Sequence, residues 1–323
     1  MKTIHIVSEN KLNDRVRRIL RLCRQEVSAG ATVEVITRNK AAVSELFASE
    51  GLLAAIVPMR GPLGMSLAPV RTASLINRGD SPARLVIHKA ADVSIALNAK
   101  RLSRNPADVE IRAYFSDLSR ADLGAGRERL YGATDRIELP SASLKDRFLS
   151  AFPGSDPSKV AAADYSALRA AYRPKEIPAG PLQLLYVGDI DSECGLDVLV
   201  QTLGEPSNPD WRLTVAGSGR GRDVMPIVRA TRSLGIADRI EWLGNVENTG
   251  ELYERAAVAV LPAKSGGGNA LAAEDALAAG CRVIAASTGC HPEIFASLPG
   301  VFLVEPGNPQ AMKEALDAVV NKS

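Results

Sequence analysis

Short apolar runs alternate with longer amphipathic stretches along the first half of the chain. Strand-like runs lie at residues 4–7, 32–37, 54–58 and 84–88, and helix-like stretches lie at 13–28, 41–50 and 91–102. The Pro- and Gly-punctuated segment 59–64 is predicted to be a loop. Such alternation is typical of a parallel sheet covered by helices on both faces.

The second half repeats this alternation more regularly. Strands are predicted at 183–187, 212–216, 240–242, 257–261 and 281–285, and helices at 196–203, 223–234, 251–255, 270–279 and 309–320. A polar stretch rich in Pro and Gly separates the two halves, which predicts an N-terminal domain over 1–172, a linker over 173–180 and a C-terminal domain over 181–323. We expect two doubly wound α/β domains facing a cleft, with a ligand at the carboxyl ends of the strands.

Composition narrows the class of protein. The 323 residues contain no apolar run approaching 18 residues, so no membrane span is expected, and residues 1–7 are interpreted as a first strand rather than a signal peptide. The four cysteines lack CxxC spacing, which disfavours a zinc site or a disulfide framework and favours a reducing cytoplasm. With aromatic residues at only 4 %, stacking on nucleic acid is not expected.

Charge is distributed unequally between the two halves. Residues 1–180 contain 28 Lys and Arg against 19 Asp and Glu, a net charge of +9, and the remaining residues contain 11 against 18, a net charge of −7. Five of the basic residues lie on the first predicted helix: Arg15, Arg17, Arg18, Arg21 and Arg24. The basic half is predicted to face an acidic substrate, to contact an anionic membrane surface peripherally, or to be an ordinary solvated surface.

Three glycine loops follow predicted strands of the second half, at 187–189, 216–222 and 262–269. Glycine lets backbone N–H groups approach a phosphate, and a following helix N-terminus adds partial positive charge. Strand-to-helix turns also use glycine for geometry alone, so each loop has both interpretations. The second loop has GxGxG rather than GxGxxG spacing, which disfavours a nicotinamide dehydrogenase.

Seven motifs in the second half carry a family resemblance. They are LLYVGD at 184–189, GLDVL at 195–199, LTVAGSG at 213–219, LGIADRIEWLGNV at 234–246, AVLP at 259–262, DALAAG at 275–280 and TGCHPEI at 288–294. In order and spacing this segment resembles the donor-binding domain of retaining GT-B glycosyltransferases of the family-four type. The resemblance implies a GT-B fold, metal-independent transfer from a nucleotide-sugar, no further cofactor, and a glycan, lipid-linked or small-molecule acceptor, often at the inner face of a membrane.

The resemblance also implies where the donor diphosphate would lie. Family members place an Arg after the glycine that corresponds to Gly188 and a Lys about five residues later, but this chain has Asp189 and Cys194 there. In the next two loops the implied donor residues are Gly217, Arg220, Asn245 and Val246. We therefore expect Lys264, Arg220 or Arg222 to supply the missing positive charge to a diphosphate.

A third donor loop would hold the sugar and the ribose. Its implied residues are Lys264, Gly267, Gly268, Asn269, Ala270, Glu274 and Asp275. Family members have two Glu residues here. The second corresponds to Asp275, whereas the first corresponds to Gly267, with Glu274 one residue out of register as a substitute.

In the N-terminal half the resemblance implies Asp117 as a catalytic residue, because Ser116-Asp117 stands where family members have a His that is often followed by Asp. His88 at a predicted strand end is a second catalytic candidate, with a core or strand-end role as the alternative. The Asp189-Ile190-Asp191 triplet spells DxD, a metal-binding pattern of a different fold, and no metal site is predicted from it. The sequence thus predicts a glycosyltransferase, and the departures at Asp189, Cys194 and Gly267 keep open a non-catalytic relative that binds a nucleotide, a glycan or a partner protein.

Overall fold

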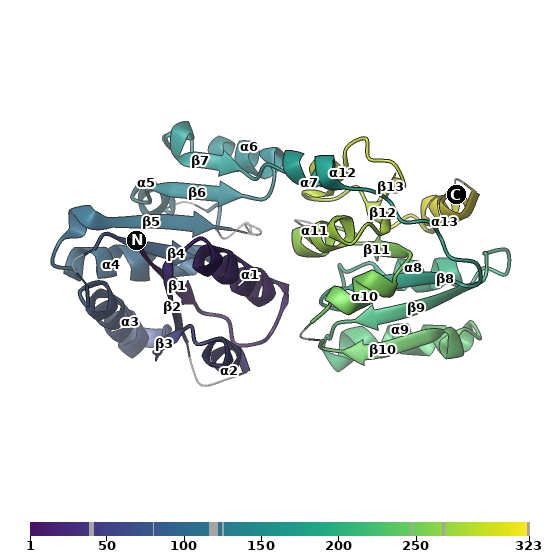
Figure 1. Cartoon of the computed structure of the whole chain (residues 1–323), viewed down its shortest axis with the longest axis horizontal. Helices are drawn as coiled ribbons and strands as arrows, with labels where there is room; N and C mark the ends of the chain where they lie inside the picture. The colour runs from purple at the N-terminus through teal and green to yellow at the C-terminus, as the bar shows by residue number, and fades with distance from the viewer. Residues whose placement is uncertain are drawn as a thin grey trace. The chain divides into compact units, whose positions relative to one another are not determined.

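The computed structural model describes residues 1–38, 42–79, 81–115, 122–124, 126–246, 248–266 and 269–321. The chain divides into two compact units, Met1–Ala163 and Asp164–Ser323. In Figure 1 the first runs from purple to teal and the second from teal to yellow. Each is built around its own parallel sheet, as the alternation of apolar runs predicted.

The described residues of the first unit form a seven-stranded sheet with the order β3-β2-β1-β4-β5-β6-β7. The strands are β1 (Lys2–Val7), β2 (Thr32–Thr37), β3 (Leu53–Ile56), β4 (Ala83–Ile87), β5 (Val109–Tyr114), β6 (Arg136–Leu139) and β7 (Val160–Ala162). The helices are α1 (Asp14–Ser28), α2 (Ala42–Ser49), α3 (Gly61–Ile76), α4 (Val93–Leu102), α5 (Glu128–Gly132) and α6 (Ala142–Ala151), with 3-10 turns η1 (Ala90–Asp92), η2 (Pro106–Asp108) and η3 (Pro157–Lys159). The strand order reverses between β1 and β4, the usual ligand position in an open parallel sheet.

The loop predicted over 59–64 is correct for residues 59–60 and wrong from residue 61, where α3 begins. Pro62 lies in the first turn, where its missing N–H costs no hydrogen bond and its fixed φ suits a helix. Gly61 has a φ of +71°, which turns the chain into the helix. Since residues 61–70 carry no charge, no alternation of apolar and polar positions reveals this helix in the sequence.

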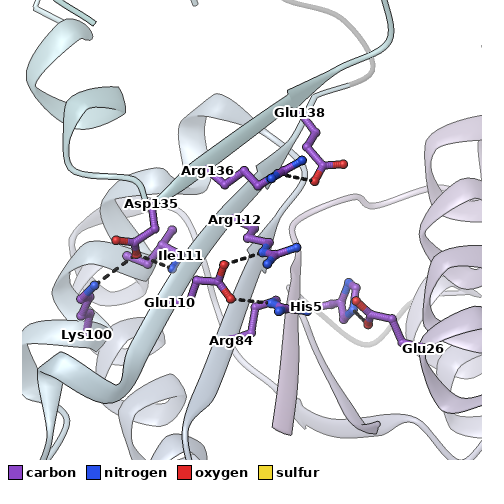
Figure 2. A network of polar contacts seen from close by, with 10 residues as sticks. All are labelled: His5, Glu26, Arg84, Lys100, Glu110, Ile111, Arg112, Asp135, Arg136 and Glu138. Carbon is purple, nitrogen blue, oxygen red and sulfur yellow. Dashed lines mark hydrogen bonds and ion pairs between the residues drawn. The ribbon is translucent and has the colours of Figure 1, made fainter. Parts of the chain in front are cut away.

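Helices cover the two faces of this sheet differently. Val16, Ile19 and Cys23 of α1 pack with α2 over β1 and β2, and helices α3 to α6 cover the opposite face with a larger apolar cluster. On the α1 side, β4, β5 and β6 instead carry charged side chains that pair with one another, as Figure 2 shows. These pairs are Arg84–Glu110 at 2.7 Å, Arg112–Glu110 at 2.6 Å and Arg136–Glu138 at 2.9 Å. This part of the sheet face is therefore polar and lies outside the core.

The described residues of the second unit form a six-stranded parallel sheet with the order β10-β9-β8-β11-β12-β13. The strands are β8 (Leu182–Val187), β9 (Trp211–Ala216), β10 (Ile240–Gly244), β11 (Val258–Leu261), β12 (Arg282–Ala286) and β13 (Val301–Val304). The helices are α7 (Ser166–Ala171), α8 (Leu196–Leu203), α9 (Gly221–Ser233), α10 (Gly250–Arg255), α11 (Ala270–Ala278), α12 (His291–Phe295) and α13 (Pro309–Asn321), with the 3-10 turn η4 (Ala237–Arg239). Here the strand order reverses between β8 and β11.

Residues 164–172 pack with the second unit. The Tyr172 hydroxyl donates to the carbonyl of Cys281 at 2.9 Å, and the Arg169 guanidinium donates to the carbonyl of Glu293 at 2.5 Å.

Cys23, Cys194, Cys281 and Cys290 are all free and buried. Among the described helices none is long and apolar enough to cross a membrane.

Candidate functional site

In the second unit, the loops that follow β8 and β11 meet at the position where the strand order reverses. The Lys264 N–H donates to the carbonyl of Glu193 at 2.8 Å, and the Ser265 hydroxyl donates to the Glu193 carboxylate at 2.6 Å. The glycine loops predicted from the sequence at 187–189 and 262–269 therefore lie at the same edge of one sheet.

Glycine is required here because the loops approach more closely than a side chain allows. A Cβ on Gly195 would lie 1.8 Å from the Pro262 carbonyl oxygen, and Gly195 also has a φ of +73°. A Cβ on Gly217 would lie 1.8 Å from the carbonyl oxygen of Gly188, and one on Gly219 would lie 2.0 Å from that of Ile190. The loops after β8, β9 and β11 thus form one closely packed backbone surface at the strand ends.

Asn269 connects three of the strand ends. Its side-chain N–H₂ donates to the Val187 carbonyl at 3.3 Å, and its side-chain oxygen caps α11 by accepting from Ala272 N–H at 3.1 Å. Its own backbone N–H donates to His291 Nε2 at 3.1 Å. The orientation of Asn269 is therefore fixed from β8, α11 and the loop that follows β12.

His291, the first residue of α12, is fully buried. Burial lowers the pKa of its imidazole, so that the ring is neutral. Because Nε2 accepts from Asn269, the proton lies on Nδ1, which donates to the Ala286 carbonyl at 2.9 Å. His291 is a functional candidate that the sequence analysis missed, although it lies in the 288–294 motif.

The loop after β8 exposes acidic side chains and buries a thiol. Asp189, Asp191 and Glu193 are exposed, whereas Cys194 is buried, and burial raises the pKa of its thiol. The backbone around Gly188 and Asp189 is held by the Tyr186 hydroxyl, which donates to the Asp189 carbonyl at 2.8 Å. The two positions at which the family resemblance implies cations are therefore an exposed carboxylate and a buried neutral thiol.

The predicted substitute cations lie on neighbouring loops. Lys264 Nζ is 3.0 Å from the Asp197 carboxylate. Arg220 is exposed at the N-terminus of α9, with no carboxylate within 4.0 Å among the described residues, and Arg222 lies 3.8 Å from Asp223. In the loop that contains Arg220, the Ser218 hydroxyl donates to the side chain of Asn245, which follows β10, at 3.0 Å. Arg220 is thus the predicted cation that no described carboxylate neutralises.

The remaining predicted donor residues lie near the start of α11 and after β10. Ala270 is buried at the first position of α11, and Glu274 and Asp275 are half-buried one turn further along. Val246 is half-buried after β10. Gly267, Gly268 and the catalytic candidate Asp117 lie outside the described residues.

In the first unit, His88 follows β4 and is buried against His5 of β1. His5 Nδ1 lies 3.1 Å from His88 Nε2, and His5 Nε2 lies 2.8 Å from the Glu26 carboxylate. Burial, reinforced by His5, Arg15 and Arg18, lowers the pKa of His88 far below its ordinary value. Both contacts are satisfied either with one proton on each ring, His5 donating to Glu26 and His88 to His5, or with two protons on His5, which then donates to both Glu26 and His88.

A second group of polar side chains lies at the same strand ends. The Ser8 hydroxyl donates to Asp92 at 2.6 Å, and burial raises the pKa of Asp92 to about 6. Glu9 contacts Arg15 at 2.6 Å and Lys89 at 2.8 Å, and although its burial acts in the opposite direction these cations lower its pKa. The sequence analysis did not identify Asp92 as a functional candidate, because its burial depends on the packing of η1.

Across the described residues, no group of three or more His, Cys, Asp or Glu side chains is arranged to hold a metal ion.

A family model and several known proteins are similar to this chain. A family model described as "Glycosyl transferases group 1" matches residues 169–323. Glycogen synthase of Mycobacterium tuberculosis is 31 % identical over 139 residues, which are 40 % of this chain and 32 % of that protein. The chain thus spans about a third of the length of this relative.

Solved structures resemble the whole chain. A glycosyltransferase from Rickettsia africae superposes with a TM-score of 0.77 at 15 % identity, covering 99 % of this chain and 88 % of that one. Anabaena Alr3699/HepE in complex with UDP and glucose gives a TM-score of 0.77 at 15 % identity, covering 99 % and 90 %. These similarities and the two parallel sheets confirm the predicted GT-B fold, with two Rossmann-like domains.

Proposed function

We propose that this chain is a glycosyltransferase that takes a sugar from a nucleotide-diphosphate sugar bound at the strand ends of the second unit. The observation that carries the proposal is the closely packed glycine surface after β8, β9 and β11, in which Gly195 and Gly217 leave no room for a Cβ. This surface lies within the residues that match the glycosyl transferase family model. The solved complex of the Anabaena protein with UDP and glucose adds support.

In this proposal the diphosphate lies against backbone N–H groups of the loops and is neutralised by Arg220, with Lys264 as a second cation. A charge-assisted hydrogen bond to a phosphate contributes roughly 1.5–3 kcal/mol. Loss of Arg220 should therefore weaken binding by about tenfold or more. Lys264 first has to leave Asp197, which lies 3.0 Å away, so its contribution is smaller.

The finer features of the reaction are part of the same proposal. Transfer retains the configuration at the anomeric carbon, requires no metal ion, and is accelerated by positioning and by stabilisation of the departing diphosphate. His88 and Asp117 are the proposed catalytic residues of the first unit. For His88 this assignment is supported by its position after β4, where contacts with His5 and through it with Glu26 hold the imidazole ring in place.

The acceptor is proposed to be a glycan, a lipid-linked sugar or a small molecule. We further propose that the reaction takes place in the cytoplasm, with peripheral contact between the first unit and the inner face of a membrane.

A non-catalytic role as a nucleotide- or glycan-binding protein is the second candidate. It is favoured by the exposed Asp189 and the buried Cys194, which occupy positions at which the family resemblance implies cations. A negative charge beside a diphosphate opposes binding unless Arg220 or Lys264 compensates for it.

The test is nucleotide release from uridine, adenosine and guanosine diphosphate sugars, first with water and then with glycan or lipid-linked acceptors. The proposal predicts saturable release with one nucleotide, a product of the same anomeric configuration as the donor, and no loss of activity with a chelator. Binding of a nucleotide without release under any condition would favour the non-catalytic role.

A further inference from the structure

Helix α3 of the first unit presents an apolar surface to solvent. Its inner side is buried through Ala68, Thr72, Leu75 and other residues. Its opposite side, the α3 outer face, consists of exposed residues at helical spacing: Leu63, Ser66, Leu67, Val70, Arg71 and Ser74. Leu63 is 65 % exposed, Val70 is 53 % and Leu67 is 41 %.

Single exposed hydrophobic side chains are ordinary on protein surfaces, but a helix that is apolar on both sides is typically buried or interfacial. The three side chains lie at positions i, i+4 and i+7, so they form one continuous stripe along the helix. The only hydroxyl between them, that of Ser66, donates to the carbonyl of Pro62 at 3.1 Å. The stripe is therefore a contact surface that no described residue covers.

The charged residues of the segment that contains α3 are basic. Residues 51–79 contain no Asp or Glu, and their three charged residues are Arg60, Arg71 and Arg78, all exposed. The Arg104 N–H donates to the Asn77 side chain at 2.9 Å, which brings the basic end of α4 to the end of α3. There Arg101 and Leu102 are exposed as well.

These arginines differ from those of α1, on which the sequence analysis had focused. On α1, Arg15 contacts Glu9 at 2.6 Å and Arg24 contacts Glu50 at 2.7 Å, so that part of its positive charge is neutralised. Arg71 and Arg78 have no carboxylate within 4.0 Å among the described residues. Within the part of the chain that the structure describes, the apolar stripe and arginines without a carboxylate partner therefore coincide at α3.

We propose that the α3 outer face docks on an anionic lipid bilayer. Leu63, Leu67 and Val70 insert at the boundary between headgroups and acyl chains, and Arg71 and Arg78 contact lipid phosphates. The charge complementarity selects a lipid surface over a second copy of this chain, whose α3 would bring the same positive charges together. The proposal specifies the membrane contact within the proposed function, and it is tested without nucleotide or acceptor.

Figure 1 shows the position of α3 in the first unit. The test is co-sedimentation of the full chain with phosphatidylcholine vesicles that contain or lack phosphatidylglycerol. We expect binding only to the anionic vesicles. The double substitution Leu63→Ser and Leu67→Ser should weaken it by about 100-fold, and Arg71→Gln with Arg78→Gln by about 25-fold. Met225→Ser on α9, where the side chain is 48 % exposed, is the matched control and should leave binding unchanged.

Thermal melts of each variant establish that the fold is intact, and nucleotide affinity measured on the same preparations separates this proposal from sugar transfer. Absence of binding to anionic vesicles would overturn the proposal. So would equal binding by the double leucine variant, or a dimer in solution that this variant dissociates.

Discussion

Asp92 gives the most quantitative prediction about the first unit. Its carboxyl group is 4 % exposed at the end of η1 and accepts from Ser8 Oγ at 2.6 Å. Burial is the largest influence on its pKa and raises it. Glu9 adds to the increase, while Ser8, Lys89 and Arg60 oppose it, and the result is a pKa of about 6.

The direction of the pH effect follows from this pKa. Because the folded state holds the proton more tightly than the unfolded state, the contribution of Asp92 to stability is complete below the ordinary pKa of 3.8 and is lost as the pH rises through about 6. The difference of about two units between the pKa of Asp92 in the folded state and its ordinary value corresponds to a stabilisation of about 3 kcal/mol. About 1.4 kcal/mol of this stabilisation is lost between pH 5 and pH 8.

Asp92→Asn removes this titration and retains an oxygen that can accept from Ser8. We therefore expect the free energy of unfolding of the variant, relative to that of the natural chain, to rise by about 1.4 kcal/mol from pH 5 to pH 8. Urea unfolding followed by circular dichroism across this pH range measures the difference, with Asp108→Asn at an exposed site of the same unit as the control. A difference that stays constant with pH, or that falls as the pH rises, would refute the reasoning.

Two further substitutions test the geometry of the second unit. Gly195→Ala places a Cβ 1.8 Å from the Pro262 oxygen at a φ of +73°. It should therefore separate the loops after β8 and β11 and abolish nucleotide binding measured by calorimetry. Gly221→Ala is the control, because a Cβ at Gly221 meets open space, and it should leave binding unchanged. Equal affinities of the two variants would contradict the close-packing argument. His291→Ala removes a fully buried side chain and leaves the half-buried Asn269 N–H without its acceptor. It should lower the free energy of unfolding by roughly 2–4 kcal/mol and weaken nucleotide binding. An unchanged urea midpoint would show that Asn269 is held in another way.

Much of the fold follows from local patterns in the sequence. The predicted helix over 196–203 has the bounds of α8, because Gly195 marks its start and its apolar positions are periodic. The predicted strand over 212–216 differs from β9 by one residue, because Trp211 also lies in the sheet. Helix α3 was missed because Leu63, Leu67 and Val70 lie on its exposed side and its first ten residues carry no charge, so that the alternation of apolar and polar positions is weak.

The candidate site was less predictable, because its parts come from strands far apart in the sequence. The glycine loops could be recognised, since glycine marks close backbone approach, and Gly195 and Gly217 show such approach. The Asn269–His291 contact and the His5–His88 contact join residues of different strand ends. No local spacing reveals them, and the burial that lowers the pKa of both His88 and His291 arises only from the packed fold.

Binding of nucleoside diphosphates tests the central claim most directly. Titration calorimetry with UDP, ADP and GDP is performed on the natural chain, on Arg220→Ala and Lys264→Ala, and on Arg232→Ala at the other end of α9 as the control. The account predicts saturable binding of one nucleotide, about tenfold weaker binding for Arg220→Ala, a smaller loss for Lys264→Ala and no change for Arg232→Ala. No binding of any nucleotide, or affinities that are unchanged in both Arg220→Ala and Lys264→Ala, would contradict it.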